Sequence, residues 1–285
     1  MKNLLFTFLL LICPAFASNL YAFELVYEKA TDTVYSHPHD VVLSADQRYL
    51  YVADNGNDRI AVLDPDSLKL LGSFGLDELN EPHDVVFDGA GRLLVADTGG
   101  SRIAIYEVDG MQAKLVDELS QLIRRPEGVA VHPNGYVYAT GAGSGNIVAY
   151  DNGQIVYSMG GLAAPHDVSV APDGTLWIAD SNNNRLLNVT QKLKIIRALE
   201  GKPYNFSGPR YLDFDDAGRL YIADKYNHQI KVLAPDLSML LTLGDPQSTF
   251  GPRYFDRPEG ITIHTNRVWF ADTYNDRIVR YRIVD

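Results

Sequence analysis

Cysteine is almost absent from this sequence. The single cysteine among 285 residues, Cys13, lies in an N-terminal segment that we expect to be removed from the mature protein. A mature chain without cysteine has no disulfide, no thiolate metal ligand and no cysteine nucleophile. Its fold must therefore be stabilised by a hydrophobic core, and 46% of its residues are hydrophobic.

Long apolar runs are also scarce. Lys2 precedes one such run, "LLFTFLLLIC", which is followed by the small residues "AFA" at 15–17. A positive charge, a short apolar stretch and small residues are typical of a secretory signal peptide, and the run is too short to span a membrane. We therefore expect a signal peptide at 1–17, cleaved after Ala17 or after Ala22. The mature protein is then secreted or periplasmic, without stable membrane insertion.

Positive charge is the third shortage. Lysine and arginine number 25 against 36 acidic residues, and the net charge is −11. A surface of that sign repels nucleic acid phosphates, so we expect no nucleic acid partner. It accepts neutral or cationic ligands and metal ions, which leaves a small molecule, a peptide or another protein as the expected partner. The Gly-x-Ser-x-Gly sequence of serine hydrolases is missing as well.

What the chain does contain is a repeat. Six related phrases begin at prolines spaced 39 to 49 residues apart. Each continues with an apolar run, a tight turn, a second strand, a loop, a third strand and a short fourth strand. Four antiparallel strands in about 40 residues are typical of a propeller blade. The sequence therefore predicts an all-β, six-bladed β-propeller over residues 23–285. The opening prolines are Pro38, Pro82, Pro126, Pro165, Pro209 and Pro258.

The two ends of the repeat region predict how the ring closes. The sixth copy stops at Asp285 after its third strand, whereas the segment "FELVYEK" at 23–29 precedes the first copy and resembles an isolated strand. Pairing this segment with the last blade supplies the missing fourth strand and covers an otherwise open sheet edge. The alternative is an unpaired linker after the signal peptide.

The loops between the second and third strands share a signature. They read "VADNGNDRI", "VADTGGSRI", "IADSNNNRL", "IADKYNHQI" and "FADTYNDRI". With these loops the chain resembles the NHL-repeat family, which implies a propeller fold. Because the aspartate recurs in five copies, we expect it to bond the loop backbone rather than to catalyse a reaction. These aspartates are Asp54, Asp97, Asp180, Asp224 and Asp272.

The residue after each opening proline is charged or titratable in all six copies. The first strand of each blade lies nearest the axis of a propeller, so these six side chains should form a ring at one mouth of the central channel. We call them the mouth ring. They are His39, His83, Glu127, His166, Arg210 and Glu259.

The mouth ring contains candidate metal ligands. Imidazoles converging with a carboxylate suit Zn²⁺ or another divalent transition ion. One candidate set is His83, His166 and Glu259, from alternate blades. The other is His39, His83 and His166 with a glutamate nearby, and the sequence does not choose between them. There are two alternatives to a metal site: a ligand site without metal, and a pore whose polar side chains only bind water.

The next position along each copy adds candidate ligand-binding residues. It is occupied by Asp40, Asp84 and Asp167 in three copies and by Tyr211 in a fourth. A carboxylate beside a histidine can orient the imidazole through a hydrogen bond. It can equally accept hydrogen bonds from backbone N–H groups of the loop, and the sequence supports both roles.

The phrase "PHDV" also resembles the lyase domain of the peptidylglycine amidating enzymes. That resemblance implies zinc on His39, His83 and His166, and conversion of an α-hydroxyglycine peptide to an amide and glyoxylate. The lyase histidines come from alternating blades, whereas the first two here come from adjacent ones. Two hypotheses follow: a binding module at the channel mouth, or a zinc-dependent lyase or hydrolase. In the enzyme, Glu127 or Glu259 would be the base, and Arg210 would hold an anionic group.

Overall fold

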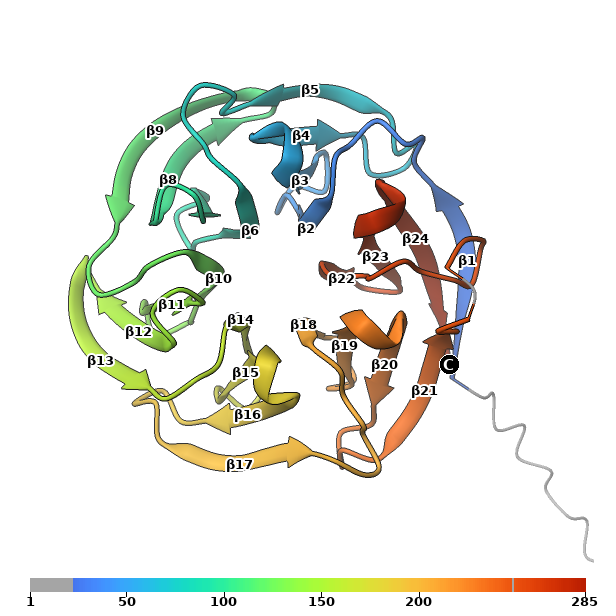
Figure 1. Cartoon of the computed structure of the whole chain (residues 1–285). Helices are drawn as coiled ribbons and strands as arrows, with labels where there is room; N and C mark the ends of the chain where they lie inside the picture. Colours follow the sequence, from blue (N-terminus) through green and yellow to red (C-terminus); the bar gives the residue numbers. More distant parts are fainter. Residues whose placement is uncertain (1–22, 248) are drawn as a thin grey trace, which may run out of the picture.

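The computed structural model describes residues 23–247 and 249–285 and arranges them as six four-stranded antiparallel sheets around one axis (Figure 1). The predicted six-bladed, all-β propeller is therefore confirmed. The predicted signal peptide at 1–17 lies outside the described residues. Within the described part, no helix is both long and apolar enough to cross a membrane.

Each blade runs from an inner strand beside the axis to an outer strand on the perimeter (Figure 1). Short 3₁₀ turns follow four of the second strands: η1 (Asn55–Asn57), η2 (Ser181–Asn183), η3 (Lys225–Asn227) and η4 (Thr273–Asn275). From the axis outward, the first blade consists of β2 (Pro38–Leu43), β3 (Leu50–Asp54), β4 (Arg59–Leu63) and β5 (Leu70–Phe74), and the second of β6 (Pro82–Phe87), β7 (Leu93–Asp97), β8 (Arg102–Asp109) and β9 (Gln112–Leu119). The third consists of β10 (Pro126–Val131), β11 (Val137–Gly141), β12 (Asn146–Asp151) and β13 (Gln154–Gly160), and the fourth of β14 (Pro165–Val170), β15 (Leu176–Asp180), β16 (Arg185–Val189) and β17 (Ile195–Glu200). The fifth consists of β18 (Pro209–Phe214), β19 (Leu220–Asp224), β20 (Gln229–Leu233) and β21 (Met239–Gly244), and the sixth of β22 (Ile261–His264), β23 (Arg267–Asp272), β24 (Arg277–Val284) and β1 (Glu24–Ala30).

The ring closes as the sequence predicts. Strand β1 pairs antiparallel with β24, so that the N-terminal segment is the outer strand of the sixth blade (Figure 1). The pairing runs from Glu24 opposite Val284 to Ala30 opposite Val279. Closure leaves the last blade with the same four strands as the others and covers the edge of β24.

The hydrophobic core lies between neighbouring blades rather than at one centre. One cluster joins Val52 and Leu63 of the first blade to Trp269 and Ile278 of the sixth. The second strands of four blades are buried along their whole length, because a sheet covers each of their faces. This explains why "LYVA" and "LLVA" are continuous apolar runs rather than alternating ones.

The recurring loop aspartates are structural, as predicted. One oxygen of Asp54 accepts a hydrogen bond from the backbone N–H of Ser36 at 2.8 Å, and the other accepts one from Nε of Arg59 at 2.7 Å. Both contacts recur in other blades, where the aspartate–arginine pairs are Asp97–Arg102, Asp180–Arg185 and Asp272–Arg277. In the fifth blade the ammonium of Lys231 replaces the guanidinium beside Asp224.

The Pro-His-Asp phrase couples each inner strand to both of its neighbours. The carbonyl oxygen of Pro38 accepts a hydrogen bond from the Thr273 hydroxyl of the preceding blade, at 2.9 Å. The carboxylate of Asp84 accepts one from the backbone N–H of Val129 in the following blade, at 2.6 Å. Equivalent bonds recur around the axis. The residue between proline and aspartate is therefore fixed on both sides, which sets the position of the mouth ring.

Glycine replaces the aspartate in the third and sixth blades, where the backbone of the next blade lies close to it. A Cβ on Gly128 would overlap the carbonyl oxygen of His166 and lie 2.7 Å from Cα of Asp167. We expect Gly128→Ala to lower the free energy of unfolding by about 1–3 kcal/mol through overpacking, measured by urea denaturation. Gly89→Ala is the control, because a Cβ there meets no atom within 4 Å. Equal stability of the two variants would contradict the inferred close approach.

Candidate functional site

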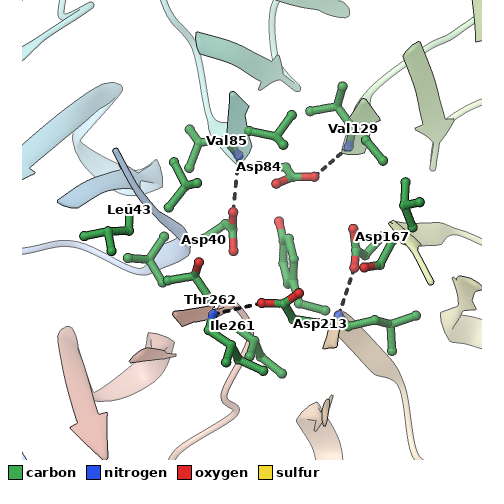
Figure 2. A pocket seen from close by; sticks show the side chains of 18 of the residues that line it. Asp40, Leu43, Asp84, Val85, Val129, Asp167, Asp213, Ile261 and Thr262 are labelled. Carbon is green, nitrogen blue, oxygen red and sulfur yellow. Dashed lines mark hydrogen bonds between the residues drawn. The ribbon is translucent and has the colours of Figure 1, made fainter. Parts of the chain in front are cut away.

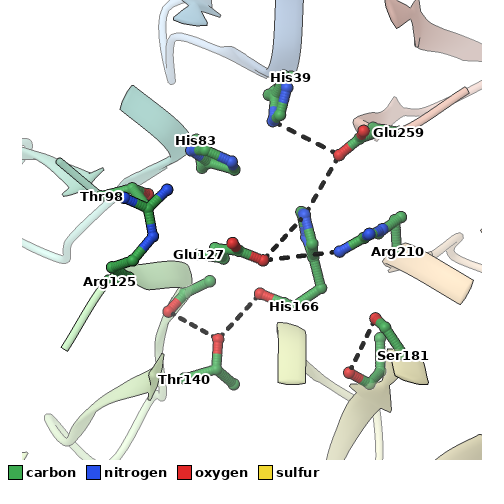
Figure 3. Close-up of polar contacts among 12 residues, drawn as sticks. His39, His83, Thr98, Arg125, Glu127, Thr140, His166, Ser181, Arg210 and Glu259 are labelled. Carbon is green, nitrogen blue, oxygen red and sulfur yellow. Dashed lines mark hydrogen bonds and ion pairs between the residues drawn. The ribbon is translucent and has the colours of Figure 1, made fainter. Parts of the chain in front are cut away.

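The six mouth-ring side chains meet at one end of the channel. Figure 3 shows them pointing toward one another from all six blades. Five stand on the inner strands, and Glu259 stands on the segment just before β22. His166 is 1% exposed and Glu259 is fully buried, whereas His39, Glu127 and Arg210 are partly exposed, so the site combines buried charge with an opening to solvent.

The three histidines lie at metal-ligand spacing. One nitrogen from each of His39, His83 and His166 lies within 4.8 Å of the others. The ring centroids of His39 and His83 are 4.1 Å apart, and those of His83 and His166 are 5.7 Å apart. Of the two ligand sets that the sequence left open, the three-histidine set meets this geometry, with Glu259 adjacent to it.

Nδ1 of His83 has two polar neighbours. It lies 2.9 Å from the carbonyl oxygen of Glu81 and 3.1 Å from Nδ2 of Asn55. The carbonyl accepts from a protonated Nδ1, whereas the amide N–H donates to an unprotonated one, so the two contacts favour opposite tautomers. In the tautomer that donates to Glu81, Nε2 keeps the lone pair that a metal ion would use. Metal-binding histidines commonly donate their other ring N–H to such an acceptor.

The two glutamates flank His166. Its Nε2 lies 3.3 Å from Oε2 of Glu127 and 3.2 Å from Oε2 of Glu259 (Figure 3). The second oxygen of Glu259 receives the Lys225 ammonium at 2.5 Å. Burial acts to raise the pKa of Glu259, but attraction to His39 in its protonated form, attraction to the Lys225 ammonium and a hydrogen bond from His166 outweigh it and hold the pKa well below its usual range. Glu259 is therefore ionised at neutral pH.

Burial gives the other ring members different protonation states. It lowers the pKa of His39 to about 3 and the pKa of His166 well below its usual range. These imidazoles are neutral at pH 7, which is the form that binds metal. Burial raises the pKa of Glu127 to about 7, although Arg210, 3.6 Å away, opposes the shift. Glu127 can therefore gain or lose a proton near neutral pH.

Unsatisfied polar atoms concentrate in this ring. Across the described part of the chain, seven buried side-chain nitrogen and oxygen atoms lack a partner in hydrogen-bond geometry, and five of them belong to the mouth ring. Three of these five, on His39, Glu127 and Glu259, have only contacts of 3.2–3.6 Å to a group of opposite type. Folded proteins rarely leave such atoms unpaired, so their clustering indicates a place that a ligand or ion completes. The five are His39 Nδ1, Glu127 Oε2, His166 Nδ1, Arg210 Nε and Glu259 Oε2.

Comparison with known sequences agrees with the repeat. The profile of the NHL repeat matches residues 79–106, 162–187 and 206–233. The chain is a propeller that contains NHL repeats. It is 26% identical to NHL repeat-containing protein 2 from Homo sapiens, over 87% of this chain and 39% of that protein. The Gallus gallus protein of the same name is 30% identical over 48% of this chain and 23% of its own length. This NHL propeller thus spans about two fifths or less of these curated relatives.

Solved structures of similar fold have varied descriptions. Virginiamycin B lyase from Staphylococcus aureus aligns with a TM-score of 0.66 and 14% identity, over 92% of this chain and 100% of that chain. A Bacteroides thetaiotaomicron protein of unknown function gives 0.74 and 13%, over 88% and 70%. A protein described as auxiliary nutrient binding, from Bacteroides ovatus, gives 0.69 and 16%, over 92% and 76%. At such identities the likeness concerns the fold alone.

The NHL propeller also brings residues to the mouth that sequence reasoning missed. Lys225 is buried against Glu259, and its ammonium lies 5.7 Å from the Tyr226 ring centroid and 5.4 Å from that of Tyr274. Arg257 stacks on Tyr274 at 4.4 Å. The sequence did mark these two loops. They read "ADKYN" and "ADTYN", whereas the other copies have Gly56, Gly99, Gly143 or Asn182 at the tyrosine position.

The predicted ligand-binding aspartates lie farther along the channel of the NHL propeller. The sequence left two roles open for them, and the structure shows the second: their carboxylates accept hydrogen bonds from backbone N–H groups. Val85 donates to Asp40, and Leu212 donates to Asp167. They line a cavity of about 400 Å³ together with Asp213 (Figure 2). Tyr211, the fourth candidate, also lines this cavity.

Proposed function

We propose that this NHL propeller is an exported binding protein that captures a small molecule, a peptide or a partner at its mouth ring, with a divalent metal as part of the site. The observation that carries the proposal is the set of three neutral imidazoles within 4.8 Å, surrounded by unpaired buried atoms. A propeller of similar fold is described as an auxiliary nutrient binding protein, which is consistent with this use of the fold.

The residues fit zinc. His39, His83 and His166 would hold the ion, since three nitrogen ligands with one open position are typical of a zinc site that binds a ligand. Glu259 would lie beside it, with Oε1 bound to Lys225 and Oε2 facing His39 and His166 at 3.5 and 3.2 Å. This pairing reduces the negative charge available to the metal and favours nitrogen ligands. Copper and nickel also bind imidazole, and elemental analysis identifies which metal the site prefers.

The remaining charges favour an anionic group on the ligand. Arg210 is largely buried, its Nε has no partner, and its contacts to Glu127 and Tyr226 are long, at 3.6 and 3.4 Å. A carboxylate could bind this guanidinium through two parallel hydrogen bonds. The exposed rings of Tyr226 and Tyr274 would add apolar contact at the rim. The proposed ligand is thus a carboxylate-bearing small molecule or peptide.

A second proposal is a metal-dependent lyase or hydrolase, and one observation favours it. Glu127 has a pKa of about 7, and its Oε2 makes only long contacts, to His166 at 3.3 Å and to Arg210 at 3.6 Å, which suits a general base at neutral pH. A bound zinc ion would supply Lewis acidity toward a substrate oxygen. In this function Arg210 would orient the substrate through its anionic group, and Glu127 would accept its proton.

Elemental analysis tests the proposed site. We expect the purified protein to hold about one zinc ion per chain after loading and dialysis, and the His83→Ala/His166→Ala variant to lose at least about 90% of it, because a single remaining imidazole is a weak ligand set. His37→Ala is the matched control, since His37 is exposed and lies outside the ring. Equal metal content in all three proteins, or none in any, would remove the metal from the proposal.

The same preparations separate the two functions. Turnover of an α-hydroxyglycine peptide that disappears with a chelator and in Glu127→Gln would establish the enzyme. Binding of the peptide without turnover would establish the binding protein.

A further inference from the structure

Tyr211 breaks the rule of the repeat at one position. The second residue after the opening proline is aspartate in the first, second and fourth blades, and glycine in the third and sixth. The aspartates accept hydrogen bonds from the following blade, and the glycines allow close backbone approach. In the fifth blade the position holds Tyr211, whose large side chain does neither.

The Tyr211 side chain crosses the channel. It begins on β18, and its hydroxyl donates to the carbonyl oxygen of His83 on β6 at 2.9 Å, with the carbonyl oxygen of Glu127 on β10 at 3.3 Å. Its ring meets the His166 imidazole edge to face, with centroids 4.9 Å apart. Only 2% of the residue is exposed. One side chain therefore contacts three mouth-ring positions: the ring of His166 on the neighbouring blade, and the backbone of Glu127 and His83 across the channel.

Tyr211 also stands between two compartments. On one side are the imidazoles of the mouth ring. On the other side is the cavity of about 400 Å³, which we call the lower cavity. Its lining includes Tyr211 and four aspartates but none of the mouth-ring residues. Figure 2 shows these aspartates arranged around the axis: Asp40, Asp84, Asp167 and Asp213.

We propose that Tyr211 is the floor of the mouth-ring site. It closes the channel, so that the site is a blind pocket entered only from the mouth, and its hydroxyl fixes the height of His83 and Glu127. The pocket then suits the terminal group of a small molecule or peptide and excludes a chain threaded through the propeller. This inference holds with or without a bound metal, and it therefore stands independently of the proposed metal site.

Modification of single histidines by diethyl pyrocarbonate tests the floor. The metal-free protein and two variants, Tyr211→Gly and Tyr211→Phe, are treated briefly, and each histidine is quantified by mass spectrometry. We expect Tyr211→Gly to accelerate modification of His166 by about tenfold or more, because opening the floor removes the barrier that now protects it. Tyr211→Phe keeps the ring and should leave the rate within about twofold of the wild type.

Three other histidines act as internal references. His37 is exposed and His264 lines the lower cavity, so both should react equally in every variant. His132 is 5% exposed and lies outside the site, and it reports general loosening of the fold. Faster modification of His166 and not of His132 supports the proposal. Unchanged His166, or equal acceleration of both, overturns it. If Tyr211→Gly does not fold, Tyr211→Leu is judged by the same criterion.

Discussion

Replacing Lys225 by methionine should lower the free energy of unfolding by about 3–5 kcal/mol, because it leaves a buried carboxylate without its counter-ion. The Glu259 carboxylate is fully buried and receives the Lys225 ammonium at 2.5 Å. Its other close neighbours are imidazoles, which are neutral at pH 7. In the described structure, no permanently charged cation other than Lys225 lies within 4 Å of this carboxylate. Urea denaturation at pH 7 measures the loss directly.

An exposed ion pair provides the matched control. Arg125 and Glu81 form a bond of 2.9 Å, but both side chains are about half exposed, and Arg125→Met should cost less than about 1 kcal/mol. The double variant Lys225→Met/Glu259→Gln should recover most of the loss, because it removes both buried charges. A similar small loss for Lys225→Met and Arg125→Met would show that the buried pair does not hold the ring together.

The second large effect is a pH dependence centred on Asp213. Its carboxyl lies in the lower cavity, accepts the backbone N–H of Ile263 at 2.9 Å, and has a pKa that burial raises to about 7. In the unfolded chain the value is about 3.9. Between these two values the folded state keeps a proton that the unfolded state has lost, so the contribution of this group to stability falls as pH rises. It amounts to about 4 kcal/mol in full.

The measurement compares Asp213→Asn with the wild type from pH 4 to pH 8. Titratable groups remote from the cavity affect both proteins equally, so the difference between the two stability curves reports Asp213 together with its repulsion of the Asp167 carboxylate. We expect the variant to gain stability relative to the wild type up to about pH 7 and no more beyond it. Asp216→Asn, at an exposed turn, should give a flat difference within about 0.5 kcal/mol. A flat difference for Asp213→Asn as well would mean that its carboxyl ionises as freely in the fold as in water.

The fold and the identity of the ring residues could be predicted from the sequence because the repeat is regular. Six prolines at similar spacing give six equivalent inner strands, and equivalent positions in a closed ring share one height and one distance from the axis. His39 and His166, 127 positions apart in the sequence, could therefore be placed at the same mouth. The closing strand followed from the same count, since the sixth copy was one strand short.

The roles of the aspartates could not be predicted in this way. A repeat gives the position of Asp84 along its strand, but the choice between an imidazole and a backbone partner depends on how closely the next blade approaches. That approach is set by packing between whole sheets. The same applies to Lys225, which lies in a loop and turns its side chain inward to Glu259.

By itself, the sequence determined the architecture, the closure and the list of polar groups around the mouth, because these depend on periodicity and on the polarity of side chains. Only the tertiary structure decided which imidazoles converge, which atoms stay unpaired and that Tyr211 spans the channel. Those features depend on rotamers and on distances of a few tenths of an ångström between chains far apart in sequence, which packing across the axis fixes and no local pattern encodes.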